Sequence, residues 1–348
     1  MADGTAAERY DAVVGGAGPA GSICATLLAR EGLRVALVDP RKNRPFAIGE
    51  CLPDAGVRNL RQLGLSFADK PEVHRRIRGV HSRWRDQDIV QDTMTLPGGG
   101  GWRLDRARFE QDLLDAAVVA GTELHADRVR DIAWQDGAWR ISTDRQLLRA
   151  NLAVDATGRS ARIARRLGAE QTPDAPQIAV WATGMPLDKP MDRTLIESLD
   201  SGWWYGAMLP DGSPLAAFHC HPSLATQLVR APELWHALLA KSQVLTQSLP
   251  LCCFADQPLK RADARGLGLN TYAGEHWFAI GDAAISFDPI ASQGFCNAIA
   301  TAAMAARAIL AGRGPDDYNE SLKRIRERYT LQISDWYAGR DRIAMSAV

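Results

Sequence analysis

The chain has 348 residues, which is enough for one large domain or two moderate ones with a substantial hydrophobic core. Its 41 basic and 41 acidic side chains balance, so charge gives no reason to expect binding to nucleic acid or to an anionic membrane. The six cysteines form no CxxC pair and the N-terminal segment has no apolar signal-peptide core, so we expect a cytoplasmic protein with reduced thiols.

The segment 10–39 has the pattern of a nucleotide-binding strand–turn–helix–strand unit. Gly16 allows the tight turn, Gly18 lets the backbone approach a pyrophosphate, and Gly21 lets the helix pack on the strand. The N-terminus of the following helix offers free N–H donors and a positive dipole end to the phosphates. Asp39 closes the second strand, where a carboxylate can accept hydrogen bonds from both ribose hydroxyls. The pattern predicts dinucleotide binding.

Two loops after this unit contain further candidates. The basic segment 41–45 brings Arg41 near the expected nucleotide, although a solvated loop is the alternative. In the loop 48–53, Glu50 and Cys51 stand just before a helix predicted at 54–63. We consider Glu50 a candidate catalytic group and interpret Cys51 as a buried, inert thiol.

Short strands are expected at 79–97, followed by a helix that begins after Asp105, a suitable N-cap residue. Arg106 lies in the first turn, where a cation is unfavourable for the helix dipole. It therefore either serves another partner or is a simple surface arginine. Residues 128–155 predict a β-meander with a turn at Asp136-Gly137.

The middle of the chain, 177–222, alternates apolar and aromatic residues between glycine and proline turns, which predicts four antiparallel strands. Such a sheet, carrying Trp181, Trp203, Tyr205, Phe218 and His219, could cover a flat aromatic ligand. The alternative is that these rings are ordinary core.

The strand at 202–209 is aromatic on both faces, because side chains alternate along a strand. Our hypothesis is that Trp203 and Tyr205, with His219 on a neighbouring strand, line a substrate pocket, while Trp204 packs away from it. His219 and His221 share a face without a further ligand cluster, so we predict no metal site.

The last informative stretch begins with a strand at 277–280 that ends in Gly281-Asp282. A loop then leads into a long alanine-rich helix, whose N-terminus could stabilise negative charge on a bound ring. The apolar segment 295–311 is too short and too polar to span a bilayer. A final helix is expected at about 316–340.

Four motifs in order resemble the glutathione-reductase-type FAD proteins, in the branch of aromatic hydroxylases that also contains flavin-dependent halogenases and geranylgeranyl reductases. They are GAGPAG with Asp39, RARF at 106–109, DATGRS at 155–160, and GDAA…DP…SQGF at 281–295. The resemblance implies FAD as the cofactor and no second nucleotide-binding unit for NADPH. The residues that it assigns to FAD are Gly16, Gly18, Pro19, Ala20, Gly21, Asp39, Arg41, Glu50, Arg106, Val129, Asp282, Pro289, Gly294 and Phe295.

The same resemblance implies an α/β fold. A Rossmann-type FAD-binding domain of the glutathione-reductase type would comprise 7–78, 100–166 and 262–348. A smaller antiparallel β-sheet substrate domain would comprise 79–99 and 167–261, and helices would end the chain.

Within the branch, the Ile48-Gly49-Glu50 loop and the segment 202–210 look like the halogenase subgroup. Two departures disfavour halogenation. Halogenases carry a lysine after the first nucleotide-binding unit, yet this chain has no lysine between Lys70 and Lys189. They also carry a glutamate before the serine of the final loop, where this chain has Ala291. What remains resembles the short maturation flavoproteins of quinone-cofactor amino-acid oxidases.

We therefore expect an FAD-dependent monooxygenase that transfers oxygen from a flavin C4a-hydroperoxide to an electron-rich aromatic ring. The substrate would be an aromatic small molecule or a tryptophan of a partner protein, and electrons would come from a separate flavin reductase or from NAD(P)H. Glu50 and His219 are the candidate catalytic residues, and Trp181, Trp203 and Tyr205 the candidate substrate pocket. The alternatives are a flavin reductase of isoprenoid double bonds, a halogenase, and a non-catalytic flavoprotein chaperone.

Overall fold

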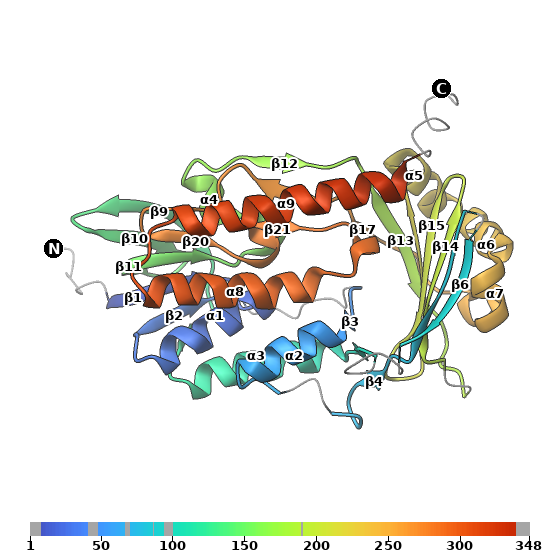
Figure 1. The fold of residues 1–348 in the computed structure, drawn as a ribbon, viewed down its shortest axis with the longest axis horizontal. Coiled ribbons are helices and arrows are strands. Elements are labelled where there is room, and N and C mark those ends of the chain that lie inside the picture. Colours follow the sequence, from blue (N-terminus) through green and yellow to red (C-terminus); the bar gives the residue numbers. More distant parts are fainter. Residues whose placement is uncertain are drawn as a thin grey trace.

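Two β-sheets lie side by side, with most of the helices packed on the larger one (Figure 1). The computed structural model describes residues 8–40, 48–66, 70–85, 87–93, 100–188 and 191–338. Arg41, predicted as a cofactor ligand, lies outside these ranges. The arrangement confirms the predicted α/β class, with a Rossmann-like sheet, a second sheet and C-terminal helices. The domain boundaries given above stay a prediction.

The larger sheet has the order β19-β20-β11-β1-β2-β8, and its central strand β1 pairs in parallel with both β2 and β11. The hairpin β9–β10 continues from β11, as the meander pattern predicted. Its turn residues Asp136 and Gly137 have φ of 52° and 70°, which the right-handed twist of a tight hairpin requires. The strands are β1 (Glu8–Gly15), β2 (Val35–Val38), β8 (Glu123–His125), β9 (Val129–Gln135), β10 (Ala138–Thr143), β11 (Leu147–Asp155), β19 (Ala273–Gly274) and β20 (Trp277–Ala279).

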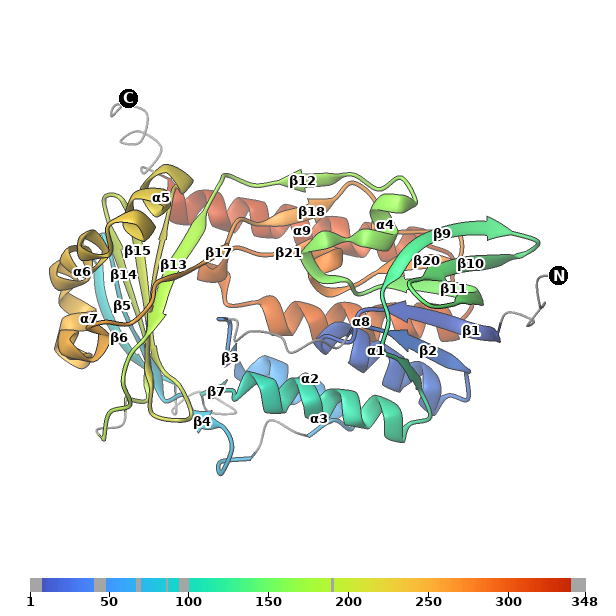
Figure 2. The ribbon, with the colours of Figure 1, turned by 180° about the vertical axis from the view of Figure 1, so that it is seen from behind.

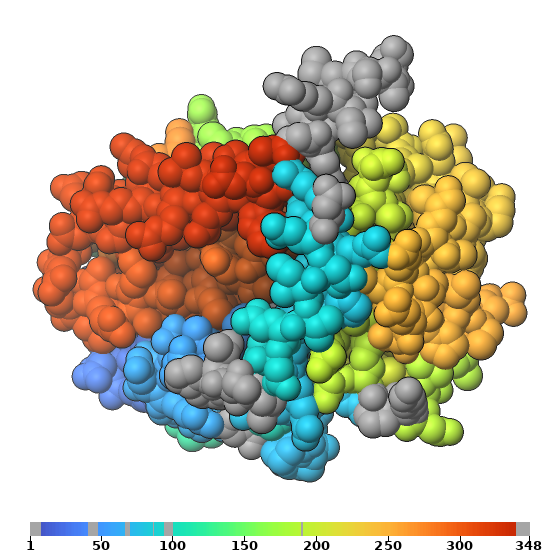
Figure 3. Space-filling model, turned by 45° about the vertical axis from the view of Figure 1, so that its right-hand side comes forward, coloured from blue at the N-terminus to red at the C-terminus, as the bar shows by residue number. Residues whose placement is uncertain are grey.

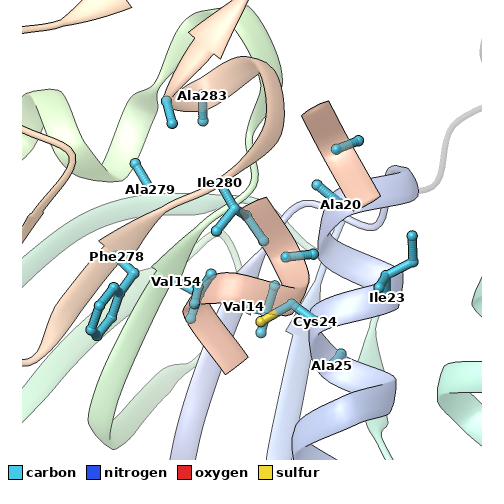
Figure 4. Packing of buried hydrophobic residues seen from close by; sticks show 14 of the residues in the cluster. Val14, Ala20, Ile23, Cys24, Ala25, Val154, Phe278, Ala279, Ile280 and Ala283 are labelled. Atoms are coloured by element: carbon cyan, nitrogen blue, oxygen red, sulfur yellow. The ribbon is translucent and has the colours of Figure 1, made fainter. Parts of the chain in front are cut away.

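Three helices pack together beside this sheet: α1 (Pro19–Arg30) contacts both α3 (Arg106–Val119) and α8 (Gly294–Leu310). Figure 4 shows how small and branched side chains, such as Val14, Cys24 and Ile280, fill the space between strands and helices. Because this core is fully buried, the strand ends and helix N-termini at its edge are held in fixed positions.

The second sheet has the order β17-β13-β16-β15-β14-β5-β6. Its four central strands pair antiparallel, which confirms the four strands predicted in 177–222. Strand β5 joins them in parallel to β14. The strands are β5 (Gly79–Trp84), β6 (Gln87–Asp92), β13 (Ile178–Thr183), β14 (Arg193–Leu199), β15 (Gly202–Met208), β16 (Pro214–Cys220) and β17 (Lys260–Asp263).

One face of this sheet is covered by α5 (Pro222–Arg230), α6 (Pro232–Lys241) and α7 (Gln243–Ser248), and the other faces the larger sheet (Figure 2). The segment 222–248 forms three helices rather than one continuous helix. Pro232 cannot donate an intrahelical hydrogen bond and begins a new helix, and Ser242 caps the third by accepting from the Leu245 N–H.

Two small three-stranded sheets connect the two layers. One joins β3 (Cys51–Leu52), β7 (Trp102–Arg103) and β4 (Arg75–Arg76), beside α2 (Asp54–Gln62). The other joins β12 (Gln171–Pro173), β18 (Leu267–Leu269) and β21 (Ile285–Ser286), and the short helix α4 (Arg162–Arg166) precedes it.

The last helix, α9 (Asp316–Tyr337), runs along the molecule from one sheet to the other (Figure 1). Near its start, the Asn319 Oδ1 accepts hydrogen bonds from the backbone N–H groups of Tyr272 and Ala273 at 2.8 and 3.0 Å. At its end, the Trp336 carbonyl accepts from the Trp84 Nε1 of β5 at 3.2 Å. Among the helices of the described ranges, none is both long enough and apolar enough to cross a bilayer.

The two faces of β15 have different neighbours. Trp204 is fully buried against Phe218 and against Trp235 of α6, with ring centroids 4.8 and 5.1 Å apart. Trp203 and Tyr205 lie on the opposite face, because successive side chains of a strand alternate. Trp204 therefore belongs to the core between sheet and helices.

We predict that Trp204→Ala lowers the free energy of unfolding by about 3–5 kcal/mol, since it leaves a cavity in a packed core. Urea unfolding would measure the loss. Trp134→Ala, at a tryptophan that is 41% exposed on the β9–β10 hairpin, is the control and should cost much less. Equal losses in the two variants would contradict this assignment of faces.

Candidate functional site

A cavity of about 940 Å³ lies between the two sheets, within the roughly 300–1,000 Å³ that is usual for cofactor pockets. One end is formed by the glycine turn before α1, and the other by the face of the second sheet that carries Trp181, Tyr205 and His219. The predicted cofactor residues on its wall are Gly16, Gly18, Pro19, Ala20, Asp39, Arg106, Val129, Asp282, Pro289, Gly294 and Phe295.

The glycine turn is pressed against the end of β11. Gly16 has φ of +105°, and a Cβ there would lie 2.2 Å from the Ala156 carbonyl oxygen. A Cβ on Gly21 would lie 1.9 Å from the Gly16 oxygen, so Gly21 serves the packing of α1 and is not on the cavity wall. Gly18 differs: it is the N-cap of α1 with φ of −76°, and it lines the cavity. The backbone at Gly18 is therefore open to a ligand.

Asp39 ties the end of β2 to this turn. Its side chain is 3% exposed, and Oδ2 accepts a hydrogen bond from the Ala17 N–H at 2.8 Å. A carboxylate fixed at the cavity wall beside a helix N-terminus matches the geometry needed for a ribose next to a pyrophosphate.

Arg106 and Asp282 also lie on the cavity wall. The Arg106 guanidinium donates to the Glu110 carboxylate and to the Ile48 carbonyl, each at 2.7 Å. These partners explain why a cation stands in the first turn of α3, and of the two alternatives above they exclude a simple surface arginine. Burial raises the pKa of Asp282, although the guanidiniums of Arg159 and Arg106 oppose that rise.

The N-terminus of α8 also opens onto the cavity, where Gln293, Gly294 and Phe295 lie on the wall. No side-chain hydrogen bond caps this end of the helix among the described residues. Its first N–H groups are available to a negatively charged or polar ring edge. Asp288 lies nearby on the wall, and burial raises its pKa to about 6.

At the sheet end of the cavity, Arg261 and Asp263 of β17 are charged residues on the wall, whereas His219, Cys51 and Tyr205 are neutral at pH 7. Burial lowers the pKa of His219 to about 3, with the backbone at Trp203 and Ala217 opposing part of that change. Burial raises the pKa of the Cys51 thiol to about 11 and that of the Tyr205 phenol well above its usual value. No hydrogen bond of normal geometry reaches either ring nitrogen of His219 within the described part of the chain. The part of the wall formed by His219 and Tyr205 therefore suits a neutral, flat group.

Trp203 is the predicted pocket residue that the structure places elsewhere. Its ring stacks on His219 with centroids 3.8 Å apart and planes 5° from parallel. His219 thus lies on the wall and Trp203 behind it, so Trp203 can influence a ligand only through the imidazole.

Glu50 does not lie on the cavity wall either. It is fully buried, and its carboxylate accepts hydrogen bonds from the Tyr205 hydroxyl at 2.6 Å, the Arg103 Nη1 at 3.1 Å and the Gly49 N–H at 3.0 Å. Arg103 is 2% exposed and also donates to Thr194 Oγ1 at 3.0 Å. Glu50 therefore holds Tyr205 and Arg103 in place, and its catalytic role stays a prediction.

Sequence reasoning missed Arg103 and the arginines near Asp155. Arg103 belongs to no recognisable sequence motif, and the pairing of β7 with β3 is what brings it next to Glu50. Arg159, on the cavity wall, donates to Ser286 Oγ at 2.6 Å. The DATGRS motif contains Arg159 and was the available signal.

His221 accepts from the Ser223 N–H as the N-cap of α5, so its ring is committed to the helix.

Known proteins resemble the chain over most of its length. It is 27% identical over 337 residues to LodB of Marinomonas mediterranea, which is named as an FAD-dependent oxidoreductase. The aligned region covers 92% of this chain and 91% of LodB. It is 29% identical to a tryptophan 2-halogenase of Chondromyces crocatus, covering 86% of this chain but 61% of that enzyme. The solved structure of QhpG, a peptidyl tryptophan dihydroxylase essential for tryptophylquinone cofactor biogenesis, superposes with a TM-score of 0.78 at 24% identity, covering 95% of this chain and 76% of QhpG.

The sequence model of the FAD binding domain matches residues 9–335, which span both sheets and the cavity between them. With the glycine turn, the carboxylate at the end of β2 and the two helix N-termini all on one cavity wall, the chain belongs to the FAD-binding domain family.

Proposed function

We propose that this FAD-dependent oxidoreductase is a monooxygenase that places one oxygen atom of O₂ on an electron-rich aromatic ring and releases the other as water. The observation that carries the proposal is the group of aromatic rings at the sheet end of the cavity, formed by Trp181, Tyr205 and His219 opposite the glycine turn. Bound FAD, once reduced, supplies the electrons that activate oxygen.

The residues of the cavity fit FAD. Gly18 and Asp39 would hold the ADP half, since a backbone without a side chain and a fixed carboxylate stand together there. Asp282 and the N-terminus of α8 at Gly294 would hold the flavin half. Trp181, Tyr205 and His219 of the second sheet line the remaining space.

The chain's own residues would orient the substrate and exclude water. Tyr205 cannot swing away, because Glu50 and Arg103 both hold its hydroxyl. Indole and phenol rings need little base catalysis, which agrees with a wall on which His219, Tyr205 and Cys51 are all neutral. Positioning of the ring is then the main contribution of the protein.

A tryptophan side chain of a partner protein is the substrate class that we favour. The support is the fold shared with QhpG, which is a peptidyl tryptophan dihydroxylase. An aromatic small molecule is the alternative, and a separate flavin reductase or NAD(P)H would supply the electrons.

Halogenation is the second candidate, and one observation favours it. Lys260 of β17 lies with its Nζ 4.8 Å from the centre of the Trp181 ring, so an ammonium stands at the rim of the aromatic wall. Against it stand Ala291, in the position where halogenases carry a glutamate, and the lack of lysine between Lys70 and Lys189. A direct assay with halide separates the two candidates.

We expect that Gly18→Val abolishes FAD binding, because the branched side chain would occupy the space of the pyrophosphate. The φ of −76° at Gly18 is open to any residue, so the fold should persist. The measurement is the FAD content of the purified protein with its circular dichroism spectrum. Gly314→Val, where a Cβ meets nothing within 4 Å, is the matched control and should stay yellow. A yellow Gly18→Val protein would refute the assignment.

With reduced FAD, oxygen and bromide, the protein should brominate neither free tryptophan nor indole. Mass spectrometry of the products checks this, with a known tryptophan halogenase assayed in parallel. Brominated product at catalytic turnover that disappears in Lys260→Met would favour the halogenase instead.

Trp181→Ala should lower the yield of hydroxylated product per O₂ consumed by about 2- to 10-fold, since a stacked aromatic contact contributes about 0.5–1.5 kcal/mol. The FAD content should not change. Trp204→Ala, on the other face of the sheet, is the control and should keep the wild-type yield for the fraction that stays folded. An unchanged yield in Trp181→Ala would place the substrate elsewhere.

A further inference from the structure

Four aromatic rings lead from the cavity to the surface in an unbroken row. His219 lies on the cavity wall and stacks on Trp203, with centroids 3.8 Å apart. The centroid of Trp203 is 6.3 Å from that of Trp84, and Trp84 is 5.3 Å from Trp336. Trp336 is 44% exposed, so the row ends in solvent.

The register of the second sheet makes this row. Trp203 lies opposite His219 on β16 and opposite Ser198 on β14. On β5, Trp84 follows Arg83, whose partner is Glu197, so Trp84 stands beside Ser198. Side chains opposite one another share a face of the sheet, and the small serine lets the two indoles meet across β14.

The end of α9 completes the row at the surface. The Trp84 Nε1 donates to the Trp336 carbonyl at 3.2 Å, which fixes the two indoles relative to each other. Figure 3 shows the segment of β5 and β6, in cyan, on the surface beside the red end of α9. Tyr337, 6.3 Å from Trp84, offers a second ring at the same place.

Core packing alone does not explain these residues. The opposite face of the same sheet has a comparable aromatic cluster of Trp204, Phe218, Trp235 and Phe254, and this cluster contacts neither the cavity nor solvent. In the row, by contrast, each ring beyond His219 is an indole, and indole is among the side chains that lose one electron most easily.

We propose that Trp203, Trp84 and Trp336 form a path that carries one-electron oxidising equivalents from the cavity to the surface. A one-electron oxidant in the cavity takes an electron from Trp203 and is reduced. Trp84 then reduces the Trp203 radical cation, and Trp336 reduces that of Trp84, so that the radical cation ends on Trp336. The exposed indole cation loses its N–H proton to water, and a thiol or an ascorbate-type reductant in solution returns the electron and the proton.

Such a path would protect the cavity. When oxygen is reduced and no substrate is bound, partly reduced oxygen species are the oxidants that would otherwise attack His219 and Trp203. This use rests on the proposed monooxygenase function. The test below needs bound FAD only and no hydroxylated product, so failure of the path and failure of the function give different results.

The experiment is flash photolysis of the FAD-loaded protein, because blue light turns bound flavin into a one-electron oxidant without any substrate. Transient absorption follows the tryptophan radical at increasing ascorbate concentration. In the wild type, the decay rate should rise in proportion to ascorbate, since the radical reaches the surface. Trp84→Phe removes the link to the two surface rings, Trp336 and Tyr337. The decay of the tryptophan radical in this variant should therefore not depend on the ascorbate concentration.

Two further variants separate electron transfer from packing. Trp84→Tyr differs from Trp84→Phe by one hydroxyl but carries an oxidisable ring, and it should keep the ascorbate dependence. Trp235→Phe, which also removes one indole hydrogen bond to a backbone carbonyl, should behave as the wild type. Under steady light without ascorbate, peptide mass spectrometry should find oxidised tryptophan at Trp336 in the wild type and at Trp203 in Trp84→Phe.

The proposal is overturned by an ascorbate dependence that survives in Trp84→Phe, by its equal loss in Trp84→Tyr, or by a wild type that forms no tryptophan radical. FAD content and the thermal melt of each variant are measured first. Should Trp84→Phe fail to fold, the double variant Trp336→Phe/Tyr337→Phe removes the same two exits from the surface side.

Discussion

The buried pair of Arg103 and Glu50 fixes the aromatic wall relative to the rest of the cavity. Glu50 belongs to the loop before β3 and Arg103 to β7, both next to the larger sheet, while their other partners, Tyr205 and Thr194, belong to the second sheet. A buried ion pair is worth little by itself, but removing one partner typically costs about 3–5 kcal/mol, because the other charge is left without compensation. The two layers are therefore bound together directly beneath the site.

The two ends of the cavity offer different groups to a ligand, and this follows from which elements form them. The glycine turn and α8 present helix N-termini, with Asp39, Asp282 and Arg106 around them, which suits phosphates and a polar ring edge. The second sheet presents the neutral rings of Tyr205 and His219, with Arg261 and Asp263 of its strand β17 also on the wall. A single cavity can thus hold a charged cofactor at one end and an uncharged ring at the other.

The sequence predicted those parts whose chemistry is local. Gly16, Gly18 and Asp39 lie in one short unit with fixed spacing. The alternation of side chains along 202–208 placed Trp204 on the opposite face of the strand from Trp203 and Tyr205. It could not place Glu50 or Trp203, because their positions depend on side chains from distant strands. Glu50 is held by Arg103 and Tyr205, and Trp203 is covered by His219. Both residues are near the site but one layer behind its wall.

The helix α9 sets a length for the whole molecule. Its 22 residues span about 33 Å, and its ends are tied to different layers, through Asn319 to β19 and its preceding loop and through Trp336 to β5. Because an α-helix resists stretching, the distance between its two attachment points fixes the separation of the two layers. One inserted residue between these ties would advance Trp336 by about 1.5 Å and turn it by roughly 100°, and its indole would leave Trp84. The helix can therefore vary in its surface residues but not in its length.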